Sequence, residues 1–207
     1  MPADRNDSDK FDKLLQVIEK ASSATARVEA LIELRLLDDN HFSQRVMETL
    51  KSALSDSEGN VRSETVMTLA FLFKDEIIPL LLSSCNDADP RVRSSVIAAM
   101  SYIGVYDDTI KHFLSSCLLD TSDDIRDRAA RALGRLGAME MVDDLCDMAL
   151  EDPSNLVRVG AISSLGMLDY HNPTLDDELK KLLDLPETHP QVIYAILDYL
   201  HQFTLVE

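Results

Sequence analysis

The histidines are the first residues of this sequence that could suggest metal chemistry. A metal site on a helix needs two ligands at helical spacing, so that both side chains reach one ion. The chain has five histidines, and no two of them stand at such a spacing; they are His41, His112, His171, His189 and His201. No histidine is followed directly by a glutamate. The sequence therefore predicts no metal site and no cofactor.

The cysteines and the known catalytic motifs likewise indicate no nucleophilic chemistry. The three cysteines, Cys85, Cys117 and Cys146, form no CxxC pair, which argues against a disulfide framework or a zinc knuckle. Cys85 and Cys117 each end an LSSC segment, and a repeated position in an apolar helix indicates core residues rather than reactive thiols. No GxGxxG, Walker loop or GxSxG motif occurs. We therefore expect a protein that is not an enzyme.

Paired carboxylates could do acid–base work, and the chain has four such pairs. They are Asp107-Asp108, Asp123-Asp124, Asp143-Asp144 and Asp176-Asp177. Each pair stands where an apolar helical pattern begins, and a negative charge at that position stabilises the helix dipole. Helix capping is therefore the favoured interpretation of these pairs.

Composition and charge narrow the class of partner. The chain has 207 residues, of which 45% are hydrophobic, and its formal net charge is -17. A field of that sign repels phosphate backbones and anionic lipids, so neither nucleic acid nor a membrane is an expected partner. The acidity either serves solubility or favours a basic protein surface. The first residues contain no apolar stretch typical of a secretory signal, and a cytoplasmic protein is predicted.

An internal repeat organises the chain. Four segments each have an acidic turn, a β-branched residue, an arginine and then an Ala-rich apolar helix. The pairs are Val61-Arg62, Val92-Arg93, Ile125-Arg126 and Val157-Arg158. From arginine to arginine the steps are 31, 33 and 32 residues, and Ala26-Arg27 and Val192-Ile193 extend the phase outward by 35 residues each. The chain therefore holds six units.

Each unit is expected to contain two helices. An apolar helical stretch precedes each Ala-rich helix, and a short run of Asp, Ser, Asn, Gly and Pro separates the two. One such pair cannot bury its apolar face alone, whereas stacked pairs build a continuous core. The prediction is an all-α fold, an α-α superhelix or solenoid of about six helix pairs. Residues 1–10 are expected to form a disordered tail, and residues 11–207 a single domain.

The acidic turn, the Val-Arg pair and the Ala-rich second helix resemble HEAT repeats, in particular the short type named after phycobilin lyases. The resemblance covers the chain from about Phe11 onward and implies an armadillo-like superhelix. It also implies a structural ladder between successive repeats, in which turn aspartates pair with helix arginines. The implied basic members are Arg27, Arg62, Arg93, Arg126 and Arg158, and the acidic members are Asp56, Asp87 and Asp152. In the fourth unit, Asp120, Asp123 and Asp124 all compete for the acidic place.

The same resemblance places the second helices on the concave face of the solenoid. Counted from the β-branched residue, offsets 3, 6 and 10 are expected to point outward. In the second to fifth units they are Glu64, Met67, Phe71, Ser95, Ala98, Tyr102, Arg128, Arg131, Arg135, Gly160, Ser163 and Met167. The candidate partner-binding residues among them are Met67, Phe71, Tyr102, Arg128, Arg131, Arg135 and Met167, because Arg, aromatic residues and Met are enriched in interface cores.

Two interpretations of this face stay open. The first is an apolar groove with a basic centre, which takes an extended or helical segment bearing a carboxylate or a phosphate. The second is a solvated face, in which the arginines pair with Asp124, Asp127 and neighbouring acids.

The predicted function is that of a monomeric, non-enzymatic protein-interaction scaffold or adaptor, whose partner is a peptide segment or a basic protein surface. One alternative is an accessory subunit of a bilin lyase, which the resemblance implies. Another is an acidic inhibitor or immunity-like protein that blocks a basic partner.

Overall fold

The computed structural model of the chain describes residues 5–37, 44–186 and 188–204. All regular elements of these residues are helical, and no strand occurs among them. The chain divides into two compact units, Met1–Ile103 and Gly104–Glu207. Each unit contains three of the six predicted helix pairs, as the repeat indicates.

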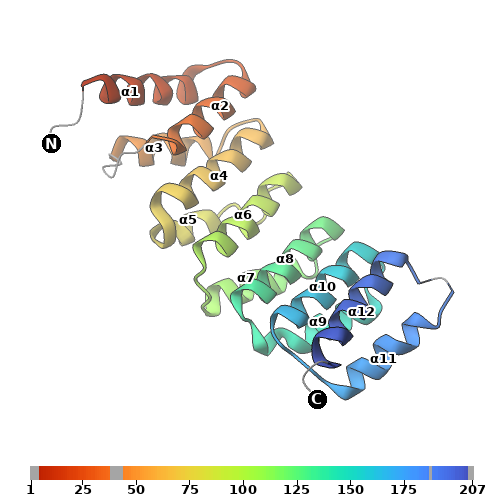
Figure 1. The fold of residues 1–207 in the computed structure, drawn as a ribbon. Helices are drawn as coiled ribbons and strands as arrows, with labels where there is room; N and C mark the ends of the chain where they lie inside the picture. The colour runs from red at the N-terminus through yellow and green to blue at the C-terminus, as the bar shows by residue number, and fades with distance from the viewer. Residues whose placement is uncertain (1–4, 38–43, 187, 205–207) are drawn as a thin grey trace. The chain divides into compact units, whose positions relative to one another are not determined.

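The first unit, called unit 1, consists of stacked helical hairpins. Its elements are α1 (Arg5–Lys20), α2 (Ala24–Arg35), α3 (Gln44–Ala53), α4 (Gly59–Phe73), the short 3-10 helix η1 (Lys74–Ile77), α5 (Ile78–Leu82) and α6 (Pro90–Ile103). The second helices of the pairs, α2, α4 and α6, pack against one another in chain order (Figure 1). The first helices α1 and α3 pack against α2 and α4.

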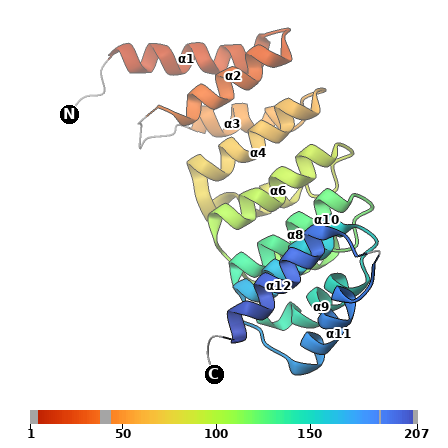
Figure 2. The same cartoon turned by 45° about the vertical axis from the view of Figure 1, so that its right-hand side comes forward.

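The second unit, called unit 2, repeats this arrangement. Its elements are α7 (Asp108–Cys117), α8 (Asp123–Leu136), the 3-10 helix η2 (Met139–Met141), α9 (Val142–Glu151), α10 (Asn155–Met167), α11 (Pro173–Leu183) and α12 (Pro190–Thr204). The second helix α10 lies between α8 and α12 and contacts both (Figure 2). Residues of α8, α10 and α12 therefore share one layer of unit 2.

In the second to sixth repeats, the β-branched residue lies at the centre of the core. Val61, Val92, Ile125, Val157 and Val192 are all fully buried. The residue four positions later, such as Val96 or Ala129, is buried in every one of these repeats. A helical turn separates the two positions, so both side chains lie on one face of the helix. The periodicity that predicts the second helices is thus the periodicity of their buried face.

The predicted acidic pairs and prolines lie at helix starts. The Asp107 side chain accepts a hydrogen bond from the backbone N–H of Ile110 at the start of α7, and Asp123 and Asp124 lie in the first turn of α8. Helices α6 and α12 begin at Pro90 and Pro190. Proline is accepted there because the first helical N–H has no partner within the helix.

The N-terminal helix begins earlier than the predicted boundary at Phe11. Helix α1 starts at Arg5, and Lys10 forms a 2.9 Å ion pair with Glu33 of α2. Residues 5–10 contain neither proline nor glycine, so nothing in them ends the helix. Residues 1–4 lie outside the described part of the chain, and the single domain over residues 11–207 stays a prediction.

Candidate functional site

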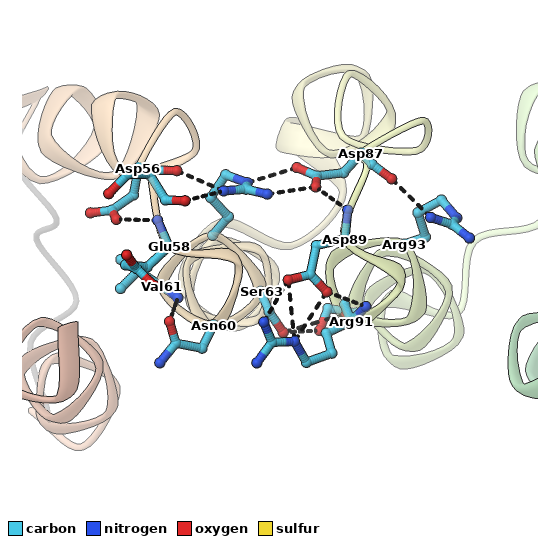
Figure 3. A network of polar contacts seen from close by, with 12 residues as sticks. Asp56, Glu58, Asn60, Val61, Ser63, Asp87, Asp89, Arg91 and Arg93 are labelled. Atoms are coloured by element: carbon cyan, nitrogen blue, oxygen red, sulfur yellow. Dashed lines mark hydrogen bonds and ion pairs between the residues drawn. The ribbon is translucent and has the colours of Figure 1, made fainter.

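In unit 1, two arginines connect successive repeats. Nη2 of Arg27 donates to Oδ1 of Asp56 over 2.8 Å, and its Nη1 donates to the carbonyl of Ala21 over 2.7 Å. Arg62 donates through Nε and Nη2 to both carboxylate oxygens of Asp87, over 2.8 and 2.7 Å. Asp56 and Asp87 lie on successive turns (Figure 3). Each arginine thus joins its own turn to the next one by charge-assisted hydrogen bonds.

Unit 2 contains the same arrangement. Arg126 donates to both carboxylate oxygens of Asp152 over 2.8 and 2.9 Å, and its Nη1 donates to the carbonyl of Asp120. Oδ1 of Asp120 accepts the backbone N–H of Ser122, two residues on. The corresponding oxygens of the other ladder aspartates accept an N–H two residues on in the same way. Asp120, rather than Asp123 or Asp124, is therefore the equivalent residue of the fourth unit.

The remaining predicted ladder arginines, Arg93 and Arg158, differ in their hydrogen bonds. Nη1 of Arg93 donates to the carbonyl of Asp87 over 2.9 Å, which is the bond that the other arginines make to their own turns. Arg158 departs from the pattern, because its Nε donates to the carbonyl of Ala149 instead. Its Nη2 makes no hydrogen bond to any described residue. By register, the acidic residue of the next turn is Glu187, which lies outside the described residues.

The ladder changes the pKa values of its carboxyl groups. The hydrogen bonds from Arg62 lower the pKa of Asp87, although burial opposes the shift. Burial acts to raise the pKa values of Asp56 and Asp152, but the hydrogen bonds from their arginines and turn N–H groups outweigh it and lower both. The ladder therefore holds these aspartates in the charged form.

Outside the ladder, the predicted apolar residues of unit 1 lie on one surface. Phe71 of α4 is 47% exposed and Tyr102 of α6 is 54% exposed. Their rings are stacked, with centroids 6.1 Å apart and an angle of 20° between the planes. Met67 is half-buried, one turn before Phe71. Exposed, stacked aromatic rings offer a large apolar contact area at little cost in side-chain entropy.

The predicted arginines of unit 2 have unequal surroundings. Arg128 is exposed, and its Nε donates to Asp124 over 2.9 Å one turn earlier. Arg131 is half-buried, and its Nε donates to Oδ1 of Asp127 over 2.8 Å. Arg135 is exposed, and Met167 of α10 is 53% exposed. Both pairs named in the solvated-face interpretation, Arg128–Asp124 and Arg131–Asp127, are present, but the aspartate of the second pair is buried.

The Asp127–Arg131 pair depends on a glycine of the neighbouring helix. Asp127 is buried on α8, and a Cβ on Gly160 of α10 would lie 2.1 Å from its Oδ1. Gly160 was expected at the outward surface, and that expectation is wrong because the Asp127 carboxylate covers this position. Burial raises the pKa of Asp127, while the attraction of Arg131 opposes the shift.

A groove lies beside Arg131 between α10 and α12. It consists of two adjoining cavities of about 390 and 590 Å³, and Arg131, Ser163, Ala195 and Asp198 line both. The remaining walls are formed by residues of α10 and α12, namely Leu156, Val159, Ile162, Gly166, Met167, Gln191, Tyr194, Tyr199 and Gln202. We call this feature the unit 2 groove.

The sequence interpretation missed the α12 wall of the groove. Offsets 3, 6 and 10 from Val192 are Ala195, Asp198 and Gln202, and all three line the groove. The periodicity that identified the outward residues of the earlier repeats would have found them. Tyr194 stands at offset 2, outside that rule, and is 72% exposed.

The residues considered for metal or thiol chemistry are not gathered into a site. Among the described residues, no three His, Cys, Asp or Glu side chains lie close enough together to hold a metal ion. Cys117 is buried, and burial raises the pKa of Cys146 to about 11, which disfavours the thiolate. Nε2 of His171 lies 2.9 Å from Oδ2 of Asp176. These two residues by themselves do not make a metal site.

Stacked helical hairpins joined by an arginine–aspartate ladder define a class of helical repeat proteins. Comparison with known families supports this class, because the family model of HEAT repeats matches residues 11–101, 47–127 and 110–200. The chain belongs to the HEAT-repeat family.

Solved structures share this fold at low sequence identity. The complex of CpcE and CpcF of phycocyanin lyase from Nostoc sp. PCC7120 matches with a TM-score of 0.61 at 18% identity, over 92% of this chain and 75% of the other. An engineered protein matches with a TM-score of 0.58 at 16% identity, over 94% and 96%. Kap121p bound to Nup53p matches with a TM-score of 0.73 at 17% identity, over 98% of this chain but 24% of Kap121p. These similarities define the fold.

No curated protein matches the sequence. In the part of the chain that the structure describes, no helix is long and apolar enough to cross a membrane.

Proposed function

We propose that the protein is a non-enzymatic interaction module, which binds a protein partner through the outward residues of its second helices. The observation that carries this proposal is the nature of those residues. The arginine–aspartate ladder and the buried core have structural roles in the repeats. Neither accounts for the stacked Phe71 and Tyr102, or for the groove beside Arg131. Exposed aromatic, Met and Arg side chains are typical of interface centres.

The first helix α9 supports this assignment, because its surface differs from that of the second helices. Helix α9 exposes Asp143, Asp144, Asp147 and Glu151 and contains no basic residue. Such a surface is well solvated and offers little apolar area to a partner. Helix α9 therefore has the character expected of a solvent face, in contrast to the outward residues of the second helices.

Quantitative affinity purification from the source cells tests the proposal. The wild-type chain is compared with Phe71→Ser/Tyr102→Ser in unit 1, with Arg131→Gln/Met167→Ser in unit 2, and with the control Asp143→Asn/Asp147→Asn on α9. The expected result is a protein that the wild type and the control recover equally and that at least one face variant loses. Equal recovery by all four, each with an unchanged helical circular dichroism spectrum, would argue against the proposal.

An accessory role in bilin attachment is a second candidate, supported by the fold similarity to the phycocyanin lyase complex. Incubation of the chain with a bilin and a phycobiliprotein subunit, followed by visible spectroscopy of the denatured protein, distinguishes it. A covalent adduct that forms only with the chain present would favour this role over a general adaptor. The predicted cytoplasmic location is compatible with both roles, whereas the predicted monomeric state fits a general adaptor better than a lyase subunit.

A further inference from the structure

The unit 2 groove contains an arginine whose position is fixed before any partner arrives. The Nε group of Arg131 donates a hydrogen bond to Asp127, and the buried carboxylate of Asp127 lies against Gly160. Among the described residues, Nη1 and Nη2 of Arg131 make no hydrogen bond, although the side chain lines both cavities of the groove. A guanidinium has five N–H donors, so four stay available to an acceptor in the groove. Because the side chain is already ordered, a ligand pays little entropy to use them.

The opposite wall of the groove carries the complementary charge. Asp198 of α12 is exposed and lines both cavities with Arg131. It forms no ion pair or hydrogen bond with any described residue, in contrast to the aspartates of the ladder. The groove therefore presents one cationic and one anionic group, each with unused hydrogen-bonding capacity.

Apolar side chains lie along the same groove. Tyr194 is 72% exposed, Leu156 is 42% exposed, and Val159 and Ala195 complete this part of the lining. The wider cavity, of about 590 Å³, is large enough for one large side chain and part of a peptide backbone. An exposed tyrosine next to a leucine is a typical anchor surface in protein interfaces.

We propose that the unit 2 groove binds a protein segment in which a large apolar residue lies between an acidic and a basic residue. The acidic side chain pairs with Arg131, the basic side chain pairs with Asp198, and the apolar side chain packs on Tyr194 and Leu156. This inference rests on the proposed binding function and specifies the partner's chemistry.

The charge distribution favours a carboxylate over a phosphate at Arg131. A phosphate brings close to two negative charges at neutral pH, and it would lie near the carboxylates of Asp127 and Asp198. A side-chain carboxylate brings one, and the basic residue of the same segment offsets Asp198. Unit 2 also carries a large excess of acidic over basic residues, which penalises a dianion further.

A selection from random peptides displayed on phage, using the full chain as the target, tests the inference. The selected peptides are expected to share an acidic, a large apolar and a basic position at constant spacing. A synthetic peptide of that sequence is then titrated by fluorescence anisotropy. Arg131→Gln is expected to weaken its binding about tenfold, the effect of one charge-assisted hydrogen-bonded pair. Asp198→Asn should act similarly through the basic position.

Three controls make the test specific. Lys181→Gln removes an exposed positive charge from α11, which lines no part of the groove, and should leave the affinity unchanged. Arg131→Gln should not weaken a peptide whose acidic residue is replaced by glutamine. Because Arg131→Gln leaves Asp127 buried without its partner, the variant Asp127→Asn/Arg131→Gln repeats the measurement with a neutral pair.

Several outcomes would overturn the inference. They are selected peptides without the acidic or basic position, equal losses for Arg131→Gln and Lys181→Gln, tighter binding of a phosphoserine peptide, and the absence of any peptide that binds the groove. Loss of partner recovery in the Phe71→Ser/Tyr102→Ser variant would still support the general binding function, so the two proposals can fail separately.

Discussion

The carboxylate of Asp127 on α8 occupies the space beside Gly160 of α10, where a larger residue would place its side chain. A Cβ at residue 160 would lie 2.1 Å from Oδ1 of Asp127 and 3.5 Å from Nε of Arg131. The ordering of Arg131 in the groove therefore depends on the absence of a side chain on the neighbouring helix.

Gly160→Ala is expected to displace Asp127 and to lower the free energy of unfolding by about 1–2 kcal/mol, the usual cost of overpacking a buried site. Urea denaturation followed by circular dichroism measures the change. Asp127→Ala removes the colliding carboxylate, so Gly160→Ala should cost much less in that background. An equal cost in both backgrounds would show that the loss has another origin.

The ladder predicts a difference between two arginines of unit 1. Arg62→Gln breaks the bidentate pair with Asp87 and leaves a partly buried carboxylate with fewer donors, so the expected loss is about 2 kcal/mol. Arg91 also pairs with an aspartate, Asp89, but its side chain is 64% exposed. Arg91→Gln should leave the urea midpoint unchanged, because exposed ion pairs contribute little. Equal shifts of the midpoint would contradict a structural role for the ladder.

The pH dependence of stability separates two groups of aspartates. The pKa of Asp87 is lowered on folding, so its contribution is present above the ordinary value of 3.8 and is lost as the pH falls through the lowered pKa. Asp127 has a raised pKa, so its contribution is fully present below 3.8 and is lost as the pH rises from 3.8 through that raised pKa. Thermal unfolding measured from neutral to acidic pH tests both signs.

Asp87→Asn should flatten the acid side of the stability curve below pH 3.8. Asp127→Asn should instead change the curve above that value, in the opposite sense. If the two variants change the same pH range in the same direction, the assigned surroundings of one carboxylate are wrong.

Helices α8 and α10 end alike but with different residues. The N–H groups of Ala138 and Tyr170 each bond to a carbonyl five residues earlier, and Gly137 and Asp169 occupy the left-handed position, with φ of 75° and 53°. Since a side chain costs energy there, Asp169→Gly should raise the free energy of unfolding by about 1 kcal/mol. The reciprocal change Gly137→Asp should lower it, although no atom lies within 4 Å of the added Cβ. Two destabilising substitutions would contradict this reason.

The helix pairs could be predicted because one repeated residue pair contributes to both the core and the ladder. In the second and fourth repeats, for example, the β-branched residue is buried and the arginine beside it pairs with the aspartate of the next turn, so composition and spacing recur in phase. Asp120 could not be distinguished from Asp123 and Asp124, because only its bond to the N–H of Ser122 identifies the turn position.

The candidate site was less predictable, because it depends on contacts between helices. Periodicity placed Arg131 outward but could not show that Asp127 holds it, since that contact requires the close approach of Gly160. The predicted outward residues came from the second to fifth repeats, so the wall that α12 contributes was not among them. Tyr194 stands outside the offset rule, so its place in the groove could be recognised only from the position of α12 beside α10.

Site-specific photo-crosslinking in the source cells tests the binding role most directly. A benzophenone amino acid replaces Phe71, Met167 or, as a matched exposed position on α9, Asp147. Binding through the second helices predicts discrete adducts with the same partner protein from position 71 or 167 and none from 147. Adducts of equal yield from position 147, or none from either second-helix position, would contradict it.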